Sequence, residues 1–178
     1  AVKRLSDITE TLRSNTRSIQ TLRQNADAAI GRDVETLNGG LARVATLNRD
    51  IQRTMVTGGD PSGLVDQRQR IIDTLASIIP MQEMPRQNGA VALITKSGIT
   101  LLDGKPVKFE FSQTPIITAD MTLSSGALGG VAIDAMLIGL PGESDRLGGG
   151  SLGAAFALRD DILVANQFAL DAIAVDLI

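Results

Sequence analysis

The feature that most limits the fold of this chain is a helical spacing of apolar residues over residues 2–55. The steps between apolar positions are three or four residues, except around Asn15 and at the polar Asn48. This spacing is typical of a long amphipathic helix with a narrow a/d-type apolar face. Gly31 and the pair Gly39-Gly40 each weaken such a helix by about 1 kcal/mol relative to alanine. We therefore predict one long helix or two nearly collinear ones, with the apolar face Val2, Leu5, Ile8, Leu12, Ile19, Leu22, Ala26, Ile30, Val34, Leu37, Leu41, Val44, Ile51 and Met55.

A second helix is expected after the glycine-rich break at residues 57–62. Asp60 can accept hydrogen bonds from the first N–H groups of this helix, and Pro61 suits its first position. The helix is predicted over residues 61–79 and ends at Pro80, which cannot continue it. Its inward face is expected to hold Leu64, Arg68, Ile71, Ile72, Leu75, Ile78 and Ile79, with the stem of the arginine lying along that face.

The spacing changes from helical to a period of two over residues 81–140, which predicts short antiparallel hairpins. Ser97-Gly98 and Asp103-Gly104 are predicted turns, because glycine accepts the backbone angles that tight turns require. The expected strands are Val91, Leu93 and Thr95 with their neighbours, Ile99 to Leu102, the alternating Val107, Phe109 and Phe111, Ile116-Ile117, and residues 131–138.

A last helix is predicted from Gly150 or Ser151 to the end of the chain, after a glycine-rich loop at residues 147–151. Its inward face is expected to hold Leu152, Ala155, Phe156, Arg159, Ile162, Leu163, Asn166, Ala169, Leu170, Ile173 and Leu177.

This order of elements predicts a mainly α fold with a small β region (α+β), built as an elongated bundle of long helices with an inserted antiparallel β-hairpin subdomain. Residues 1–80 and 141–178 are expected to form a discontinuous helical rod domain, and residues 81–140 a small β subdomain inserted in it. Fifty helical residues extend for about 75 Å, which is longer than a compact domain of this size needs. The first and last helices can therefore lie side by side, with the β region at one end or flank.

Composition excludes most kinds of chemistry. The chain has no His and no Cys, so Ser-His-Asp and Cys-His catalysis, disulfides, and imidazole or thiolate metal sites cannot form. A Ser-Lys pair is formally available at Lys96-Ser97, but a predicted turn is a poor place for a desolvated base. The net charge of −3 argues against nucleic acid as a partner. No run of about 18 apolar residues is present, so no membrane partner is expected.

Two motifs imitate binding sites. Residues 148–153 satisfy the dinucleotide pattern G-x-G-x-x-G, but they do not directly follow a strand of a βαβ unit. We interpret them as a flexible loop with tight packing at Gly153. Asp160-Asp161 point in different directions on a helix, so a solvated face or an arginine partner is favoured over a cation site. Solvated faces and pairing between helices are also expected for Arg13, Arg17, Arg23, Arg32, Arg43, Arg49 and Arg53. We predict no catalytic, cofactor-binding or metal-binding residue.

Three stretches in this order resemble the flagellar hook-associated protein 1 family. Residues 64–75 are similar to the family's Leu-x-Asp-Gln-Arg-Asp-x-Leu helix. Residues 149–154, followed by 158–161, resemble its Gly-x-Leu-Gly-x-Leu-x-x-Phe-Arg helix start, with Leu158 where Phe is common. Residues 41–51 resemble its Ile-Ala-x-Leu-Asn-x-Gln-Ile stretch, and the hairpin at residues 90–102 its short β insertion. The family's terminal axial segments have no counterpart in this sequence.

The resemblance implies a structural protein that joins hook to filament in the bacterial flagellum. It implies a location outside the cell after export through the flagellar type III system, without a cleaved signal. The implied partners of the full-length protein are the flagellar hook protein, the second junction protein, its own copies in a ring, and an export chaperone. Because the chain begins and ends inside helical patterns, we expect a central fragment that is a monomer on its own.

Two other functions are compatible with parts of the sequence. The long amphipathic helix also suits a helical sensor or signalling scaffold domain of the periplasm. Such a protein would need a ligand pocket and flanking membrane helices. An enzyme using the glycine-rich loop at residues 148–153 is the third possibility, and the absence of a preceding strand disfavours it.

Overall fold

The computed structural model describes residues 2–123, 125–134, 136–137 and 149–176. The sequence predictions for residues 138–148, Leu177 and the β subdomain boundary at residue 140 therefore lie outside the described residues, as do the side chains of Val2 and Leu5.

The long amphipathic spacing forms a single helix, α1 (Val2–Val56), as one of the two predicted alternatives. Its apolar face is buried along the second half, where Ile30, Leu37 and Leu41 have no exposed surface. Gly40 lies against the second helix, because a Cβ built there would be 2.5 Å from Cδ2 of Leu75. This glycine weakens helix α1 locally but allows its neighbour to pack closely against it.

Helix α2 (Ser62–Ile78) begins and ends within a residue of its predicted limits. Asp60 accepts a hydrogen bond from the backbone N–H of Ser62 at 2.9 Å. This backbone bond, together with one from the Ser62 hydroxyl, lowers the pKa of Asp60 below its ordinary value. Arg68, Ile72, Leu75 and Ile78 are buried, so the inward face is largely as expected.

The β region forms two small antiparallel sheets. The first has the strand order β1-β2-β3-β4, made of β1 (Met81–Pro85), β2 (Val91–Thr95), β3 (Thr100–Asp103) and β4 (Lys105–Pro106), with the short helix η1 (Gln87–Gly89) after β1. The second has the order β5-β6-β7, made of β5 (Phe109–Glu110), β6 (Ala132–Ile133) and β7 (Met136–Leu137). Strand β1 was not predicted, because its side chains are mostly exposed and not apolar in alternation.

Two strand predictions need correction. Ile116-Ile117 form no strand, because the segment around them bonds to side chains of α1 rather than to another strand. Residues 131–138 were predicted as one strand, yet the described part forms β6 and β7, which turn back on each other at Asp134 with a φ of 47°.

The last helix has three parts: α3 (Gly150–Ala157), the π-helical turn η3 (Leu158–Ile162) and α4 (Leu163–Asp176). The predicted inward face holds as far as Arg159 and again at Leu163, but it fails at other positions beyond Arg159. Ile162 and Ile173 are 54% and 53% exposed, whereas Gln167 is 5% exposed. A π-turn inserts one residue into the helical repeat, so the faces beyond it are displaced by one position.

The tight packing expected at Gly153 is instead at Gly150. A Cβ at Gly153 would meet no atom within 4 Å, whereas one at Gly150 would overlap the carbonyl oxygen of Ile78. Gly150 also has a φ of +70°, which a residue with a side chain rarely adopts. This glycine thus lets the start of α3 pass close to the end of α2.

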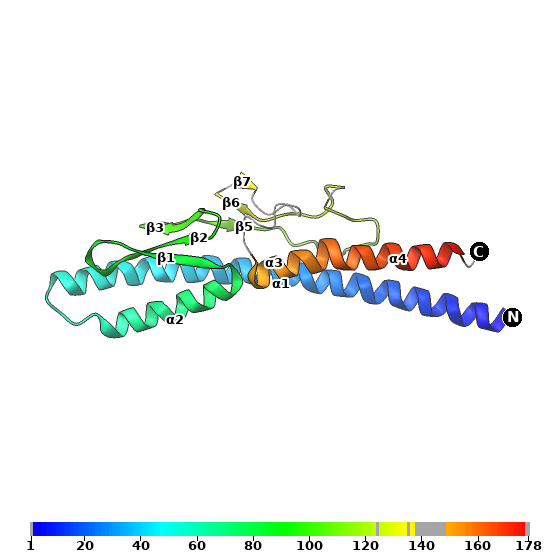
Figure 1. The fold of residues 1–178 in the computed structure, drawn as a ribbon, viewed down its shortest axis with the longest axis horizontal. Coiled ribbons are helices and arrows are strands. Elements are labelled where there is room, and N and C mark those ends of the chain that lie inside the picture. Colours follow the sequence, from blue (N-terminus) through cyan, green and yellow to red (C-terminus); the bar gives the residue numbers. More distant parts are fainter. Residues whose placement is uncertain (1, 124, 135, 138–148, 177–178) are drawn as a thin grey trace.

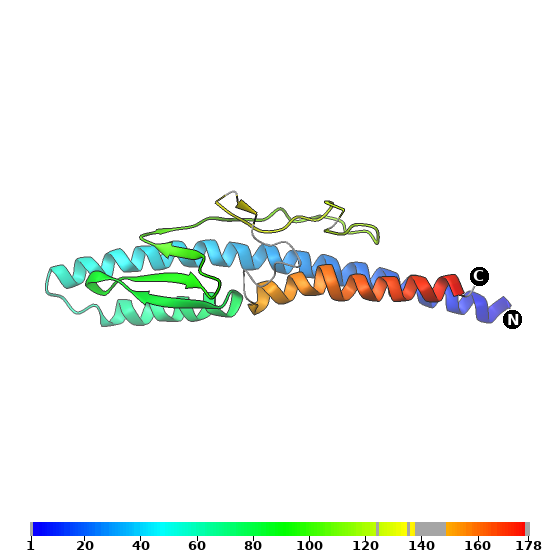
Figure 2. The same ribbon diagram turned by 45° about the horizontal axis from the view of Figure 1, so that its top comes forward.

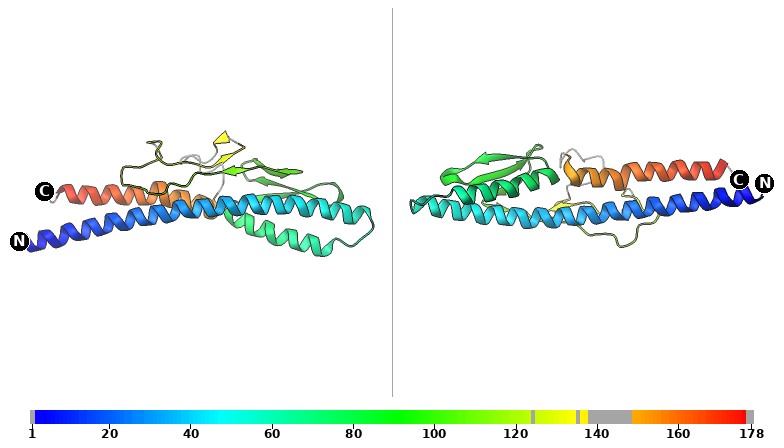
Figure 3. Two further views of the ribbon diagram at one scale, coloured as in Figure 1. Left: turned by 180° about the vertical axis from the view of Figure 1, so that it is seen from behind. Right: turned by 90° about the horizontal axis from the view of Figure 1, so that it is seen from below.

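The molecule is a rod along α1, with both ends of the chain at the same end of it (Figure 1). Helix α4 lies along the first half of α1, and α2 along the second half (Figure 2). The described residues of the β region run along one flank of the rod, and none of them extends past the α1–α2 end (Figure 3). One hydrophobic cluster contains residues of both helices and strands, including Leu41, Leu75, Leu93 and Phe109. The division into a rod domain and a separate β subdomain stays a prediction.

Candidate functional site: a polar seam on helix α1

Helix α1 carries a row of polar side chains that bond to backbone groups of the β region. We call this row the polar seam; it consists of Arg23, Gln24, Asp27, Asn38, Asn48 and Gln52. Since much of the β region lacks regular strand pairing, its backbone polar groups need partners elsewhere. The polar seam supplies several of those partners.

Two asparagines of the polar seam each hold one strand residue by both of its backbone groups. The Asn38 amide donates to the carbonyl of Phe109 at 2.9 Å and accepts from its N–H at 2.8 Å. The Asn48 amide does the same with Val91, at 2.8 Å and 3.2 Å. A carboxamide presents a donor and an acceptor in one plane, so it can imitate the edge of a neighbouring strand.

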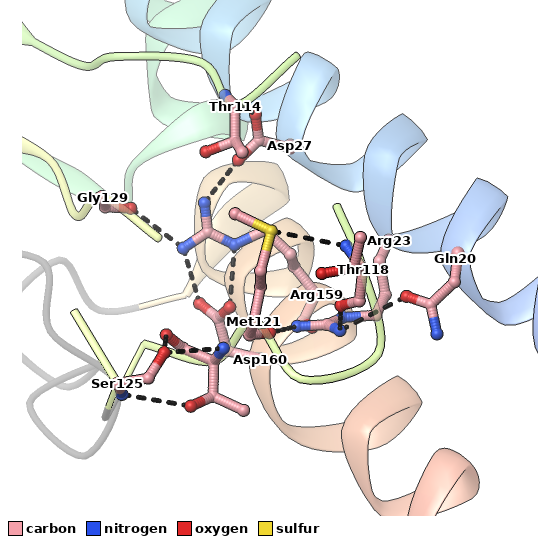
Figure 4. Close-up of polar contacts among 11 residues, drawn as sticks. Gln20, Arg23, Asp27, Thr114, Thr118, Met121, Ser125, Gly129, Arg159 and Asp160 are labelled. Carbon is pink, nitrogen blue, oxygen red and sulfur yellow. Dashed lines mark hydrogen bonds and ion pairs between the residues drawn. The ribbon is translucent and has the colours of Figure 1, made fainter. Parts of the chain in front are cut away.

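Arg23 is completely buried and donates to three carbonyl groups (Figure 4). Its Nε donates to the carbonyl of Arg159 at 3.0 Å, Nη1 to that of Thr118 at 3.1 Å, and Nη2 to that of Met121 at 2.5 Å. Burial lowers the pKa of Arg23, and the nearby carboxylate of Asp160 partly opposes this shift. Arg23 of α1 therefore connects residues 118–121 to α1 and to η3.

Arg159 is the second buried arginine, and two carboxylates hold it. Its Nη1 lies 2.5 Å from Asp27 Oδ1, and its Nε lies 2.8 Å from Asp160 Oδ1. Its Nη2 donates to the carbonyl of Gly129 at 2.9 Å. Burial disfavours its charge, but Asp160 and Asp27 outweigh that effect and raise the pKa of Arg159. The guanidinium also lies over Phe156, 5.0 Å from the ring centroid.

Asp27 joins this pair to the β region. It has no exposed surface, and its Oδ2 accepts from the backbone N–H of Thr114 at 2.7 Å. The side chain of the neighbouring Gln24 donates to the carbonyl of Pro115. Residues 114–129 are thus held against α1 and η3 by ionic and amide groups, and this explains why no strand forms at Ile116-Ile117.

Arg68 on α2 is buried in a different way. Its Nη1 donates to Asn48 Oδ1 at 2.9 Å and to the carbonyl of Gly89 at 2.7 Å. Among the described residues, its Nε is buried without a hydrogen-bond partner, and no carboxylate forms a salt bridge with its guanidinium. Burial lowers its pKa, with Glu83 opposing the shift.

The arginines of α1 follow the two expectations, solvated faces and pairing between helices. Arg13, Arg17, Arg32, Arg43, Arg49 and Arg53 are exposed. Arg23 has no exposed surface and donates to a carbonyl of the last helix. No local pattern in the sequence indicates the burial of Arg23, because its partners are carbonyl groups of distant segments. Asp160 pairs with an arginine, as one of the two interpretations of Asp160-Asp161 proposed, and Asp161 is exposed. Lys96 is exposed in the turn between β2 and β3.

The described residues contain no group of three or more acidic side chains placed to hold a metal ion. None of the helices in the described part of the chain is both long enough and apolar enough to cross a membrane. A shallow groove of about 420 Å³ lies beside α1 between Arg49, Arg86 and Asp103. The prediction that no residue is catalytic, cofactor-binding or metal-binding stays a prediction.

A comparison with protein families bears on this architecture. The family described as "Flagellar hook-associated protein FlgK helical domain" matches residues 1–178. The chain belongs to this family. The rod, its β region and the polar seam are therefore features of one member of a family of helical domains, as the resemblance had implied.

Individual relatives agree with the family. Flagellar hook-associated protein 1 of Bacillus subtilis (strain 168) is 27% identical over 144 residues, covering 72% of this chain and 28% of that protein. The protein of the same name from Escherichia coli (strain K12) is 25% identical over 128 residues, covering 61% of this chain and 23% of that protein. The chain thus spans about a quarter of the length of these curated relatives.

A solved structure agrees in fold. The flagellar hook junction protein FlgK from Burkholderia pseudomallei superposes with a TM-score of 0.69 at 19% identity, over 96% of this chain and 30% of that chain. This supports the mainly α fold with a small β region. The relatives reported are all named as flagellar proteins, so the sensor or signalling scaffold gains no support from them.

Proposed function

We propose that this chain is the helical domain of a hook-associated junction protein, which connects hook to filament in a bacterial flagellum. Its role is structural and not enzymatic. The observation that carries the proposal is the family match over the whole chain, since the matching relatives are named as hook-associated proteins. The rod shape fits this role, because a junction protein functions through its surfaces.

The full-length protein would then lie outside the cell, in the flagellum, after export through the flagellar type III system without a cleaved signal. Its partners would be the hook protein, the second junction protein, further copies of itself in a ring, and an export chaperone. These partners follow from the resemblance of residues 64–75 and 149–161 to the family. Neither nucleic acid nor a membrane is proposed as a partner.

The polar seam would serve this role by making the rod resist separation of its parts. A junction transmits mechanical load, and directional hydrogen bonds from α1 to the backbone of the β region oppose sliding as well as separation. Asn38 and Asn48 each hold a strand residue at two points. Arg23 and Arg159 hold residues 118–129 at further points.

A domain exchange tests the proposal. The matching segment of Bacillus subtilis flagellar hook-associated protein 1 would be replaced by this chain in a strain that lacks the native gene. Filaments attached to hooks and swimming should return. The matched control carries Leu41→Asp, which places a charge in the buried core and should abolish both.

The amount of exchanged protein in the culture medium separates the possible outcomes. Exported, soluble protein with no attached filaments would contradict the junction role. Small-angle scattering of the isolated chain gives a second check, because a compact globule would be inconsistent with a rod built on a helix of 55 residues.

A further inference from the structure

The π-turn η3 leaves one carbonyl of the last helix free, and a buried arginine takes it. In η3 the N–H of Leu163 bonds to the carbonyl of Leu158, five residues back. In an α-helix it would bond to the carbonyl of Arg159, four residues back. That freed carbonyl accepts from Nε of Arg23 at 3.0 Å. The turn and the arginine therefore depend on each other.

The extra residue decides which face of α4 meets α1, because each residue of an α-helix turns it by about 100°. With the π-turn, the less exposed positions of α4 are Leu163, Val164, Gln167, Leu170 and Ala174. With a regular helix, the same places would be taken by the preceding residues, Ile162, Leu163, Asn166, Ala169 and Ile173. Each set contains three aliphatic residues larger than alanine, one alanine and one amide. The two faces are therefore nearly equal in what they can bury.

The face that a regular helix would bury already lies at the edge of the contact between α4 and α1. Asn166, Ala169 and Ile173 line a groove of about 380 Å³ whose other wall contains Ile19 and Leu22 of α1. Leu22 is 47% exposed, and Ile162 and Ile173 are more exposed still. A rotation of α4 by one residue would move these aliphatic side chains into the contact. It would move Gln167 and Ala174 out.

Two contacts favour the observed arrangement. The first is the bond from Arg23 to the freed carbonyl of Arg159. The second joins the Gln20 amide to Oε1 of Gln167 at 3.0 Å, and Gln167 also donates to Asp171 at 2.8 Å. If the π-turn became a regular α-helix, the N–H of Leu163 would gain one ordinary helical hydrogen bond. The bonds from Arg23 and Gln20 of α1 would be lost.

We propose that α4 is a two-position helix, whose rotation about its own axis is set by the π-turn and held by Arg23. In the observed position Ile162 and Ile173 face outward. In the other position the turn becomes regular α-helix, and α4 presents a surface rotated by about 100° along the first half of the rod. A binding partner that contacts α4 would select between the two positions. This inference does not depend on the proposed function.

Thiol labelling tests the rotation, because the native chain has no Cys and any introduced thiol is unique. Ile173→Cys and Gln167→Cys are made separately, each with and without Arg23→Met. With Arg23 present, the thiol at position 173 should react faster than the thiol at position 167. With Arg23→Met this order should invert. An unchanged order in a chain that keeps its helical circular dichroism would overturn the proposal.

Deletion of the exposed Asp161 is the matched control, because it removes one residue from the π-turn without altering the face that follows. The deleted chain should keep the thiol introduced by Gln167→Cys protected, and Arg23→Met should no longer change that protection. If the native helix had no π-turn, the deletion would rotate α4 by one residue and expose this thiol. That result would overturn the proposal. Should Arg23→Met fail to fold, Arg23→Lys replaces it, since lysine lacks the fork of donors that reaches three carbonyls.

Discussion

The two halves of the rod are held together by different kinds of contact. The distal half consists of residues 30–56 of α1 with α2 and strands β1 to β4, and aliphatic side chains such as Leu37, Leu41 and Leu75 fill it. The proximal half consists of residues 8–27 of α1 with η3, α4 and residues 111–130. Its centre is occupied by Arg23, Asp27 and Arg159, while Ile8, Leu22 and Ile173 remain exposed.

The comparison shows that one continuous helix can join a half filled mainly by aliphatic side chains, with Asn38 and Asn48 bonded to its strands, to a half centred on buried charges. Aliphatic packing tolerates small displacements, because its free energy follows the buried area. Buried charges and amides do not tolerate such displacements, because each loses its hydrogen-bond partner when it moves. We therefore expect the distal half to supply most of the stability and the proximal half to fix the positions of α4 and residues 111–130.

The largest effect is expected from Arg159→Met, which breaks the ionic centre of the proximal half. It leaves Asp27 buried without its counter-charge, and such a loss destabilises a protein by about 3–5 kcal/mol. Urea unfolding followed by circular dichroism measures the change. Adding Asp27→Leu should recover part of the loss, since the unpaired charge is then gone. If the free energy of unfolding of Arg159→Met alone were within about 1 kcal/mol of the native value, the prediction would be contradicted.

A slightly smaller effect is expected from Leu37→Ala in the distal half. Leu37 has no exposed surface, so its truncation leaves a cavity and destabilises the protein by about 2–4 kcal/mol. The same change at the exposed Leu22 should have little effect on the same urea transition. Equal losses at the two positions would mean that the proximal half is as closely packed as the distal half.

Arg68→Met should change the free energy of unfolding by less than about 1 kcal/mol, because methionine removes a buried charge to which no carboxylate of the described residues is bound. The Asn48 carbonyl loses one of its two donors and keeps the N–H of Val91. Urea unfolding beside Arg159→Met gives the comparison. A loss as large as that of Arg159→Met would show that the distal half also depends on a buried charge.

The smallest effect concerns an exposed ion pair of the distal half. Arg86 Nη2 lies 2.8 Å from Asp103 Oδ2, and this bond lowers the pKa of Asp103 below its ordinary value of 3.8. A lowered pKa in the folded state contributes stability above the ordinary value, and that contribution is lost as the pH falls through the lowered one. Asp103→Asn should therefore reduce stability slightly at neutral pH and leave it unchanged in strong acid. Urea midpoints measured across this range check the sign.

The distal half was largely predictable from the sequence. Its helices follow a spacing of three to four apolar residues, and burial of Leu41, Leu75 and Ile78 follows from that spacing. Asn48 interrupted the apolar pattern, and the structure gives the reason, since its amide pairs with Val91. Such a pairing needs a partner 43 residues away, so no local pattern could indicate it.

The proximal half was predicted less well, for two physical reasons. A π-turn adds one residue to the helical repeat, so a regular spacing assigns Ile162 and Ile173 to the inside when they are outside. The burial of Arg23 depends on carbonyl groups of η3 and of residues 118–121, which are brought together only by the fold. An arginine among many arginines on a helix gives no sign of such partners.

The two asparagines that hold Phe109 and Val91 determine how far apart these strand residues lie along α1. At a rise of 1.5 Å per residue, Asn38 and Asn48 fix these strand residues about 15 Å apart along the helix axis. The spacing of the strands is therefore set by the helix and not by the length of the connections between them. Extra residues placed in the exposed turn at Ser97-Gly98 would leave both attachment points where they are. This turn is thus the natural place to insert a reporter peptide or a whole additional domain.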